Sequence, residues 1–171
     1  METCDLMDLH RYVRDVPDFP IPGVMFRDIS ELLSNREAFK TAVENMSEII
    51  GRDQIDYIVG IESRGFILGA AIAAFTGKGF IPLRKAGKLP PPVESHSYTL
   101  EYGQATLEVA RGQGRVAIID DVLATGGTLE AARALCVRAG FQVKSIAVLI
   151  NLKFLNEYRF GGEEIPSLLT Y

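Results

Sequence analysis

The sequence predicts a single α/β domain with a mostly parallel, twisted β-sheet that is covered by helices on both faces. Segments typical of strands alternate with segments typical of helices, and the strand segments are nearly continuously apolar, as in parallel sheets. The chain has 171 residues, of which 47% are hydrophobic and 23% are charged. A domain of this size buries a sufficient core without a disulfide or a metal. We therefore expect residues 1–171 to form one domain.

The N-terminal part of the chain indicates a short amphipathic segment, a loop and one long helix. Residues 5–14 carry leucine and valine at helical spacing. Residues 15–23 contain three prolines, which favour an extended loop. Ser34 followed by Glu37 has the pattern of a capping box, and an apolar stripe continues behind it. We therefore expect a helix over residues 35–50.

The rest of the chain alternates between expected strands and helices. Glycines end the helical segments, and Gly103 separates two short apolar runs that are typical of a hairpin. Residues 84–95 form a basic loop rich in glycine and proline, and we expect the tail from residue 151 onward to pack against the domain. The expected strands are 57–61, 80–83, 98–102, 105–110, 116–119 and 143–150, and the expected helices are 65–75 and 127–139.

The overall charge and the cysteines exclude several classes of function. The formal net charge is −4, which gives no indication of a nucleic-acid or membrane partner. Cys4 and Cys136 lie far apart, and the chain has two histidines. We therefore do not expect a zinc site, and we expect both cysteines to be reduced thiols in a cytoplasmic protein. The sequence shows neither a secretory signal nor a membrane span. An anionic ligand must therefore be held by a local arrangement of residues.

The most informative motif follows the strand expected at residues 116–119. Asp120 and Asp121 end this strand at the sheet edge where ligands of α/β folds bind. The next helix then starts at a short loop, Thr125, Gly126, Gly127 and Thr128. Free N–H groups at a helix start bind phosphate, and carboxylates suit ribose hydroxyls. Taken alone, Asp120-Asp121 is more simply explained as the end of a strand, and Gly126-Gly127 as the start of a helix. The complete string of residues 116–128 instead favours a sugar phosphate site. It lacks the lysine of a Walker A loop.

The string from Val116 to Thr128 resembles the phosphoribosyl pyrophosphate (PRPP) motif of the type I phosphoribosyltransferases. Four further segments resemble the adenine phosphoribosyltransferases of that family, in the same order: 18–30, 60–66, 84–90 and 98–103. The resemblance implies the type I phosphoribosyltransferase fold, with an N-terminal hood over 1–34 that binds the base and a flexible flap over 84–104. It also implies purine salvage: PRPP and adenine are converted to AMP and pyrophosphate, with Mg²⁺, by a cytoplasmic homodimer.

The resemblance also implies a role for individual residues. Glu101 would be the acid/base near N7 and N9 of adenine, and Asp120 and Asp121 would hold the ribose hydroxyls directly or through metal-bound water. The base would be bound by Val24, Met25, Phe26 and Arg27, with Phe26 stacking on it. The pyrophosphate would be bound by Glu62, Ser63 and Arg64, in a loop that often has a cis peptide in the family. PRPP and AMP would also contact Tyr102, Ala124, Thr125, Gly126, Gly127 and Thr128.

The loop after residue 83 concentrates positive charge in an acidic chain. Arg84, Lys85 and Lys88 carry three cations with no acid between them. A solvated basic loop is one explanation, and neutralisation of the leaving pyrophosphate is another. Gly87 and the three prolines at 90–92 indicate a hinged flap that closes over a site. Glu101 also has a purely structural explanation, because the alternation of residues 99–102 suits a strand residue that faces outward.

Ala124 bears on the choice among related enzymes. Hypoxanthine-guanine enzymes resemble this motif but usually carry an acid at that position, so Ala124 favours adenine over guanine or xanthine. A PRPP-sensing transcriptional regulator is the second alternative, but the sequence shows no added nucleic-acid-binding domain and no basic excess. Residues 89–92 read Leu-Pro-Pro-Pro where the family often has Leu-Pro-Gly-Pro. This departure leaves open how the flap closes and what His96 does.

Overall fold

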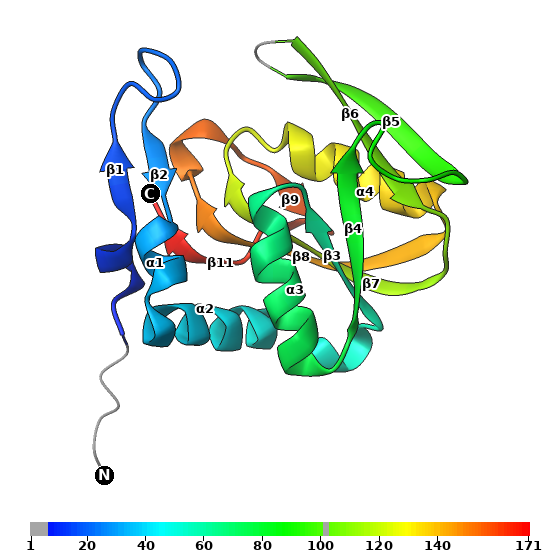
Figure 1. Ribbon diagram of the computed structural model, residues 1–171, viewed down its shortest axis with the longest axis horizontal. Helices are drawn as coiled ribbons and strands as arrows, with labels where there is room; N and C mark the ends of the chain where they lie inside the picture. The colour runs from blue at the N-terminus through cyan, green and yellow to red at the C-terminus, as the bar shows by residue number, and fades with distance from the viewer. Residues whose placement is uncertain (1–6, 101–102) are drawn as a thin grey trace.

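The computed structural model describes residues 7–100 and 103–171 (Figure 1). Its strands are β1 (Arg14–Val16), β2 (Phe26–Asp28), β3 (Tyr57–Ile61), β4 (Gly79–Lys85), β5 (Val93–Leu100), β6 (Gly103–Ala110), β7 (Gly114–Leu123), β8 (Phe141–Asn151), β9 (Arg159–Phe160), β10 (Glu163–Glu164) and β11 (Ser167–Thr170). Its α-helices are α1 (Ser30–Ser34), α2 (Arg36–Ile49), α3 (Arg64–Thr76) and α4 (Gly127–Arg138). Short 3-10 helices are η1 (Leu9–Tyr12), η2 (Arg52–Gln54) and η3 (Lys153–Leu155). None of the helices in this described part is long and apolar enough to cross a membrane.

A seven-stranded sheet with the order β11-β8-β7-β3-β4-β6-β5 forms the centre of the domain. The strands from β11 to β4 are parallel, whereas β4, β6 and β5 pair antiparallel. Alternate residues of β7 belong to two cores: Ala117 and Ile119 to one, Val116 and Ile118 to the other. The sheet is therefore buried on both faces, which confirms the predicted fold class.

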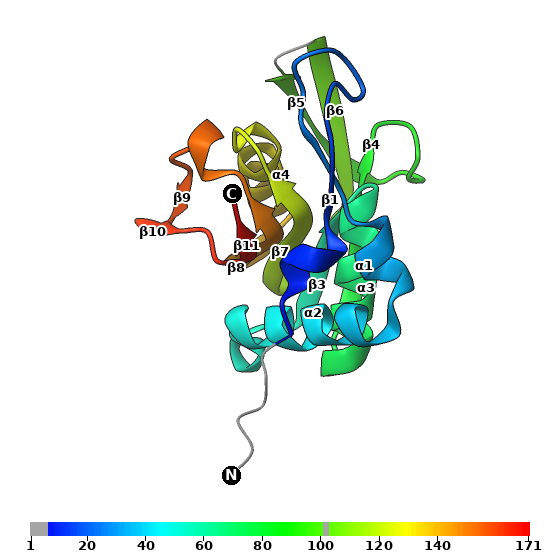
Figure 2. The ribbon, with the colours of Figure 1, turned by 90° about the vertical axis from the view of Figure 1, so that its left-hand side faces the viewer.

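The helices cover the two faces of the sheet unequally. Helices α2 and α3 contribute to one core, and α4 contributes to the other, so that α3 and α4 lie on opposite sides of the sheet (Figure 2). Helix α3 packs closely on β3, because a Cβ atom at Gly60 would lie only 2.8 Å from the carbonyl oxygen of Gly65. The glycine at position 60 therefore permits this close contact.

The N-terminal region differs from the prediction in two respects. The described part of residues 5–14 contains only the short helix η1, and β1 and β2 then pair antiparallel. Asn35, not Ser34, caps the long helix, since its Oδ1 accepts the N–H groups of Glu37 and Ala38 at 3.1 and 3.0 Å. Ser34 belongs to the preceding helix α1, and its hydroxyl donates to the carbonyl of Glu31. The capping-box prediction was wrong because Ser34 is the last residue of α1, and Asn35 is the residue between the two helices.

The hairpin and the tail follow the prediction with different bounds. The basic loop is shorter than expected, because β4 continues to Lys85 and β5 begins at Val93. Strand β4 is extended by its pairing with β6, where Arg84 lies opposite Glu108. The expected packing of the tail is confirmed by β11, which adds a parallel strand beside β8.

Candidate active site

The candidate site lies where two neighbouring parallel strands end and their chains turn to opposite faces of the sheet. Strands β3 and β7 are adjacent, with Gly60 opposite Ile119. After β3 the chain enters α3 on one face, and after β7 it enters α4 on the other. Such a divergence opens a crevice at the carboxyl edge of the sheet, which is where α/β folds bind ligands. In Figure 1 the loop between β1 and β2 and the β5–β6 hairpin rise above this edge on either side.

A pocket of about 720 Å³ occupies this edge. One wall comes from the loop before β2, and another from the end of β7 and the start of α4. The third wall comes from Leu152, Phe154 and Leu155, at and around η3. The sequence analysis did not assign these three residues to the site, although Phe154 belongs to the tail that was expected to pack. The remaining lining residues are Pro22, Gly23, Val24, Met25, Asp120, Val122, Leu123, Ala124, Thr125, Gly126, Thr128 and Leu129.

Two buried carboxylates lie within the last part of β7, which continues to Leu123 instead of ending at these acids as predicted. Asp120 is 9% exposed and Asp121 is 5% exposed, and Asp120 Oδ1 accepts the N–H of Asp121 at 2.9 Å. Burial, together with the neighbouring Asp121, raises the pKa of Asp120 well above its ordinary value. Burial also raises the pKa of Asp121, although the Arg64 guanidinium acts in the opposite direction. Arg64 Nη2 lies 2.6 Å from Asp121 Oδ2. The pair is therefore held together at a site that disfavours its full ionisation.

Arg64 connects the acid pair to the N-terminal β1–β2 region. Its Nη1 donates to the carbonyl oxygen of Arg27 at 3.2 Å, and its guanidinium lies 4.8 Å from the ring centre of Phe26. The peptide bond between Glu62 and Ser63, just before Arg64, is cis. The next residue, Gly65, must be small because a Cβ atom there would lie 2.9 Å from Asp120 Oδ1. The loop after β3 therefore packs directly on the carboxylates.

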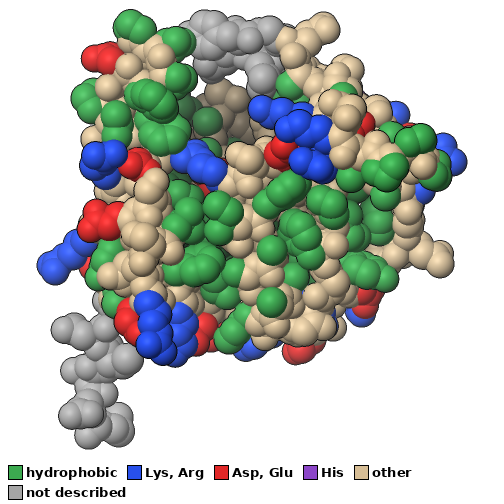
Figure 3. Space-filling model, viewed as in Figure 1, with side chains coloured by type: hydrophobic (Ala, Val, Ile, Leu, Met, Phe, Trp, Pro, Cys, Tyr) green, Lys and Arg blue, Asp and Glu red, His purple; other side chains and the backbone are tan. Residues whose placement is uncertain are grey.

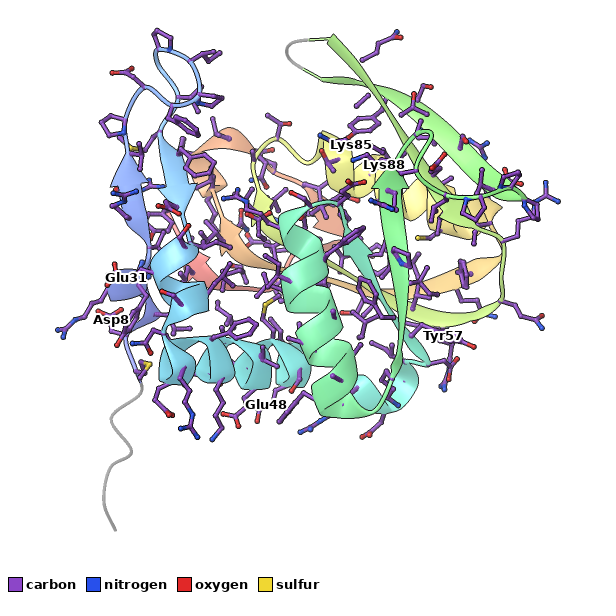
Figure 4. The ribbon with its side chains drawn as sticks, viewed as in Figure 1. Asp8, Glu31, Glu48, Tyr57, Lys85 and Lys88 are labelled. Carbon is purple, nitrogen blue, oxygen red and sulfur yellow. The ribbon has the colours of Figure 1, made fainter. Side chains whose placement is uncertain are left out.

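Glu62 gathers the positive charges that follow β4. Its carboxylate lies 2.5 Å from Lys88 Nζ and 3.4 Å from Arg84 Nε, and it accepts the N–H of Lys85 at 2.9 Å. Lys88 is the main cause that lowers the pKa of Glu62 to about 2, against the effect of burial. Figure 4 shows Lys85 and Lys88 at the end of β4, and Figure 3 shows Lys and Arg side chains gathered beside a hollow there. Cations and one acid thus form a cluster next to the crevice.

The loop between β7 and α4 presents backbone donors to the pocket. Gly126 precedes α4 with φ of +93°, and a Cβ atom there would lie 2.9 Å from the side chain of Tyr158. Among the described residues, no side chain caps this helix. Its first N–H groups are therefore available to an anion, and the helix dipole favours negative charge at this end. Thr128 lines the pocket beside this loop, 3.5 Å from the hydroxyl of Tyr98.

The structure brings most, but not all, of the expected site residues to one place. Val24 and Met25 line the pocket, whereas Phe26 lines a separate hollow of about 450 Å³ beside Arg64. The Arg27 side chain pairs with Asp15 and lies over the ring of Tyr171 at 3.9 Å. Glu101 and Tyr102 lie outside the described residues, and their expected roles stay predictions.

The sequence and the fold of this chain are similar to those of known phosphoribosyltransferases. The family model described as "Phosphoribosyl transferase domain" matches residues 28–155. The adenine phosphoribosyltransferase of Bdellovibrio bacteriovorus is 54% identical, over 96% of this chain and 100% of that protein. The crystal structure of the adenine phosphoribosyltransferase from Rhodothermus marinus is 42% identical with a TM-score of 0.87, over 97% of this chain and 98% of that chain. The Giardia lamblia enzyme, solved with 9-deazaadenine, is 36% identical with a TM-score of 0.86, over 99% of both chains. The chain therefore belongs to the phosphoribosyl transferase domain family and, within it, to the adenine phosphoribosyltransferases, which are pentosyltransferases.

Proposed function

We propose that this chain transfers the 5-phosphoribosyl group of PRPP to adenine, forming AMP and releasing pyrophosphate, as a step of purine salvage. The observation that carries the proposal is the composition of the 720 Å³ pocket. Its lining combines the carboxylate of Asp120, an uncapped helix start and apolar walls, which match a ribose, its 5′-phosphate and a purine, and Asp121 adds a second carboxylate directly behind Asp120. The named relatives support the same reaction.

The PRPP phosphate and ribose have separate partners in this proposal. The 5′-phosphate is bound by the backbone and hydroxyl donors of Thr125, Gly126, Gly127 and Thr128, where the helix dipole of α4 favours an anion. Asp120 and Asp121 accept hydrogen bonds from the ribose hydroxyls. Asp121 already has Arg64 as a partner, so a bound ribose shares this carboxylate with the guanidinium.

Adenine is placed against the apolar side of the pocket. Val24 and Met25 approach from the loop before β2, and Ala124 lies opposite them on the loop after β7. Ala124 has a methyl group at the position where related hypoxanthine-guanine enzymes usually carry an acidic side chain. This difference favours a 6-amino-purine over a 6-oxo-purine as the substrate. Phe26 is proposed to stack on the base and Arg27 to contact it, which requires both side chains to turn from the positions described above, where Phe26 lines the second hollow and Arg27 pairs with Asp15. The ring centre of Phe26 lies 5.0 Å from that of Phe19, edge to face.

The leaving pyrophosphate is assigned to the loop after β3 and the cations after β4. Arg64 supplies one cation, and Arg84, Lys85 and Lys88 supply the others, with Ser63 adding a hydroxyl. Glu62 pairs with Arg84 and Lys88 in this structure. Its carboxylate keeps these cations together and takes the role of their anion when no pyrophosphate is bound.

The residues fit Mg²⁺ that arrives with PRPP rather than a resident metal. In residues 7–100 and 103–171, no three His, Cys, Asp or Glu side chains form a group that could hold a metal ion. Mg²⁺ commonly binds through one or two carboxylates together with substrate phosphates, and Asp120 and Asp121 supply two carboxylates at the pocket. Asp120 and Asp121 would hold Mg²⁺ together with PRPP, and the ion would supply positive charge for the pyrophosphate.

The proposed chemistry is a displacement at C1′ with inversion through an oxocarbenium-like transition state. The bond between C1′ and the pyrophosphate oxygen breaks, and its electron pair leaves with pyrophosphate. Adenine N9 forms the new bond to C1′, and Glu101 accepts the proton that N9 loses. Tyr102, next to Glu101, is proposed to contact the substrate from the same segment of the flap. The cation cluster stabilises the negative charge that develops on the leaving group.

The proposal is tested by measuring pyrophosphate release from PRPP with the purified protein, with and without adenine. Release that depends on adenine and is at least tenfold slower with guanine, xanthine or hypoxanthine supports it. Release with an oxo-purine but not adenine would reassign the base, and nucleic-acid binding without turnover would favour a PRPP-sensing regulator. Omission of Mg²⁺ is expected to abolish turnover. A homodimer is expected in light scattering, and the free thiol of Cys136 agrees with a cytoplasmic location.

A further inference from the structure

Glu108 is a buried acid for which the proposed reaction has no use. It lies on β6 opposite Arg84 of β4, and only 4% of its surface is exposed. A charged side chain is seldom this buried unless it is paired or hydrogen-bonded. Its surroundings therefore indicate what it does.

Three consecutive backbone N–H groups converge on the Glu108 carboxylate. Oε2 accepts from Gly87 at 3.0 Å, and Oε1 accepts from Lys88 at 2.7 Å and from Leu89 at 2.6 Å. Successive N–H groups in a turn form a concave anion site, which is filled here by a side chain of the same protein. Burial raises the pKa of Glu108, but the three N–H donors outweigh it and the pKa is lowered overall. The carboxylate is therefore ionised and fixes the turn by charge-assisted hydrogen bonds.

The turn held by Glu108 determines where two cations point. Lys88, whose N–H is bound by Glu108, extends its Nζ to Glu62 Oε1 at 2.5 Å. The carbonyl oxygen of Lys88 accepts Arg84 Nη1 at 3.2 Å. Both side chains thus depend on the backbone position of residue 88. The Glu108 carboxylate faces this turn, so it acts on the cations through the backbone.

We propose that Glu108 is a positioning residue that fixes the turn at residues 87–89 and thereby presents Lys88 and Arg84 to the leaving pyrophosphate. The inference rests on the proposed function, which assigns the pyrophosphate to these cations. A purely structural role for Glu108, support of the β5–β6 hairpin, makes a different prediction. It would lower thermal stability or affect both substrates alike.

The test is steady-state kinetics of Glu108→Gln with both substrates varied. The amide has nearly the same shape but presents an NH₂ group to N–H donors, so the turn loses its anion. The KM for PRPP and the inhibition constant for pyrophosphate should rise roughly tenfold or more, as for loss of hydrogen bonds to a charged group. The KM for adenine should change less than about twofold. Glu94→Gln is the matched control, because Glu94 lies on the same hairpin and pairs with Arg111, and it should leave all three constants unchanged.

A double variant separates positioning from support of the fold. In a Lys88→Ala background the effect of Glu108→Gln should shrink to about twofold or less, because its main route of action is absent. Full additivity, equal effects on both substrates, or no effect on the PRPP constants would overturn the inference. If Glu108→Gln does not fold, Glu108→Asp decides by the same comparison, since it keeps the charge and shortens the reach. A wild-type protein without adenine-dependent pyrophosphate release would instead contradict the proposed function.

Discussion

Arg64 and Asp121 form an ion pair, with Nη2 2.6 Å from Oδ2, that joins the start of α3 to the last part of β7. Under the proposed function these two segments bind different parts of PRPP: the pyrophosphate on one side and the ribose on the other. The pair therefore couples the two halves of the substrate site before the substrate arrives. Because Asp121 is 5% exposed, loss of its partner leaves a buried acid that must take up a proton or be hydrated.

Replacing Arg64 should lower kcat/KM for PRPP much more than it changes the KM for adenine. In Arg64→Ala, both a pyrophosphate ligand and the partner of Asp121 are lost, so kcat/KM for PRPP should fall at least tenfold while the KM for adenine changes little. Arg36→Ala is a suitable control, because Arg36 is exposed, pairs with its neighbour Glu37 on α2 and lines neither hollow. Initial rates over a matrix of both substrate concentrations measure the effect. Equal PRPP dependence in Arg64→Ala and the wild type would contradict the coupling.

The buried acid pair should lower stability as the pH rises. Burial and Asp121 raise the pKa of Asp120 above its unfolded value near 3.8, so the native state binds more protons than the unfolded state between these two values. Stability consequently falls as the pH rises through the native pKa. Asp120→Asn should therefore raise the melting temperature at pH 7, by about 2–4 °C for each kcal/mol, and abolish PRPP binding.

Asp56 provides a control of opposite sign for this pH dependence. Its pKa is lowered by hydrogen bonds from Arg115, so its contribution to stability is present above the unfolded pKa and is lost at acid pH. Asp56→Asn should lower the melting temperature at pH 7 and leave PRPP binding intact. Melting curves between pH 4 and pH 8 distinguish the two variants. A stabilising effect of both would show that general removal of negative charge, not burial, is the cause.

Glu62→Gln should alter binding of pyrophosphate. Glu62 neutralises Lys88 and Arg84, and a neutral amide leaves these cations free for an anion. We expect product inhibition by pyrophosphate to become several-fold stronger. Because Lys88 holds the pKa of Glu62 at about 2, the difference from the wild type should be the same from pH 6 to pH 9. Weaker inhibition by pyrophosphate would mean that Glu62 serves mainly to hold the cations in place.

Gly65→Ala should damage both the fold and the site. The added Cβ would lie 2.9 Å from Asp120 Oδ1 and 2.9 Å from the carbonyl oxygen of Ile119, so the loop must move at a cost of about 1–3 kcal/mol. The melting temperature and PRPP binding should fall together. Gly127→Ala is the comparison for stability alone, because a Cβ there meets nothing within 4 Å. Its melting temperature should stay equal to the wild type or rise.

Glu101→Gln tests the proposed proton acceptor. If Glu101 accepts the N9 proton, kcat should fall on the order of 10²–10⁴-fold while the dissociation constant of PRPP changes little. Rapid-quench measurement of AMP formation together with calorimetric PRPP binding separates these quantities. Near-wild-type turnover would exclude Glu101 from the chemistry.

Short-range patterns in the sequence determined much of this protein. The run from Val116 to Thr128 specifies a strand, a turn and a helix start through near neighbours, and the fold class and the family follow from such patterns. The cap of α2 was misassigned by one residue, since a short helix such as α1 owes its existence to packing rather than to its own propensity. Local patterns therefore predicted helix α2 but neither the short helix α1 nor the residue that caps α2.

Tertiary structure alone decided which residues meet. Arg64 and Asp121 are far apart in the chain, and Glu108 holds a turn about 20 residues before it. Leu152, Phe154 and Leu155 close the pocket because β8 ends beside β7, whereas Phe26 turns to a second hollow one residue after Met25. The direction of a side chain and its distant partners depend on how sheet and helices pack, and residue spacing contains no such information. The sequence determined the chemical groups, and the packing of β3, β4, β6 and β7 determined their arrangement.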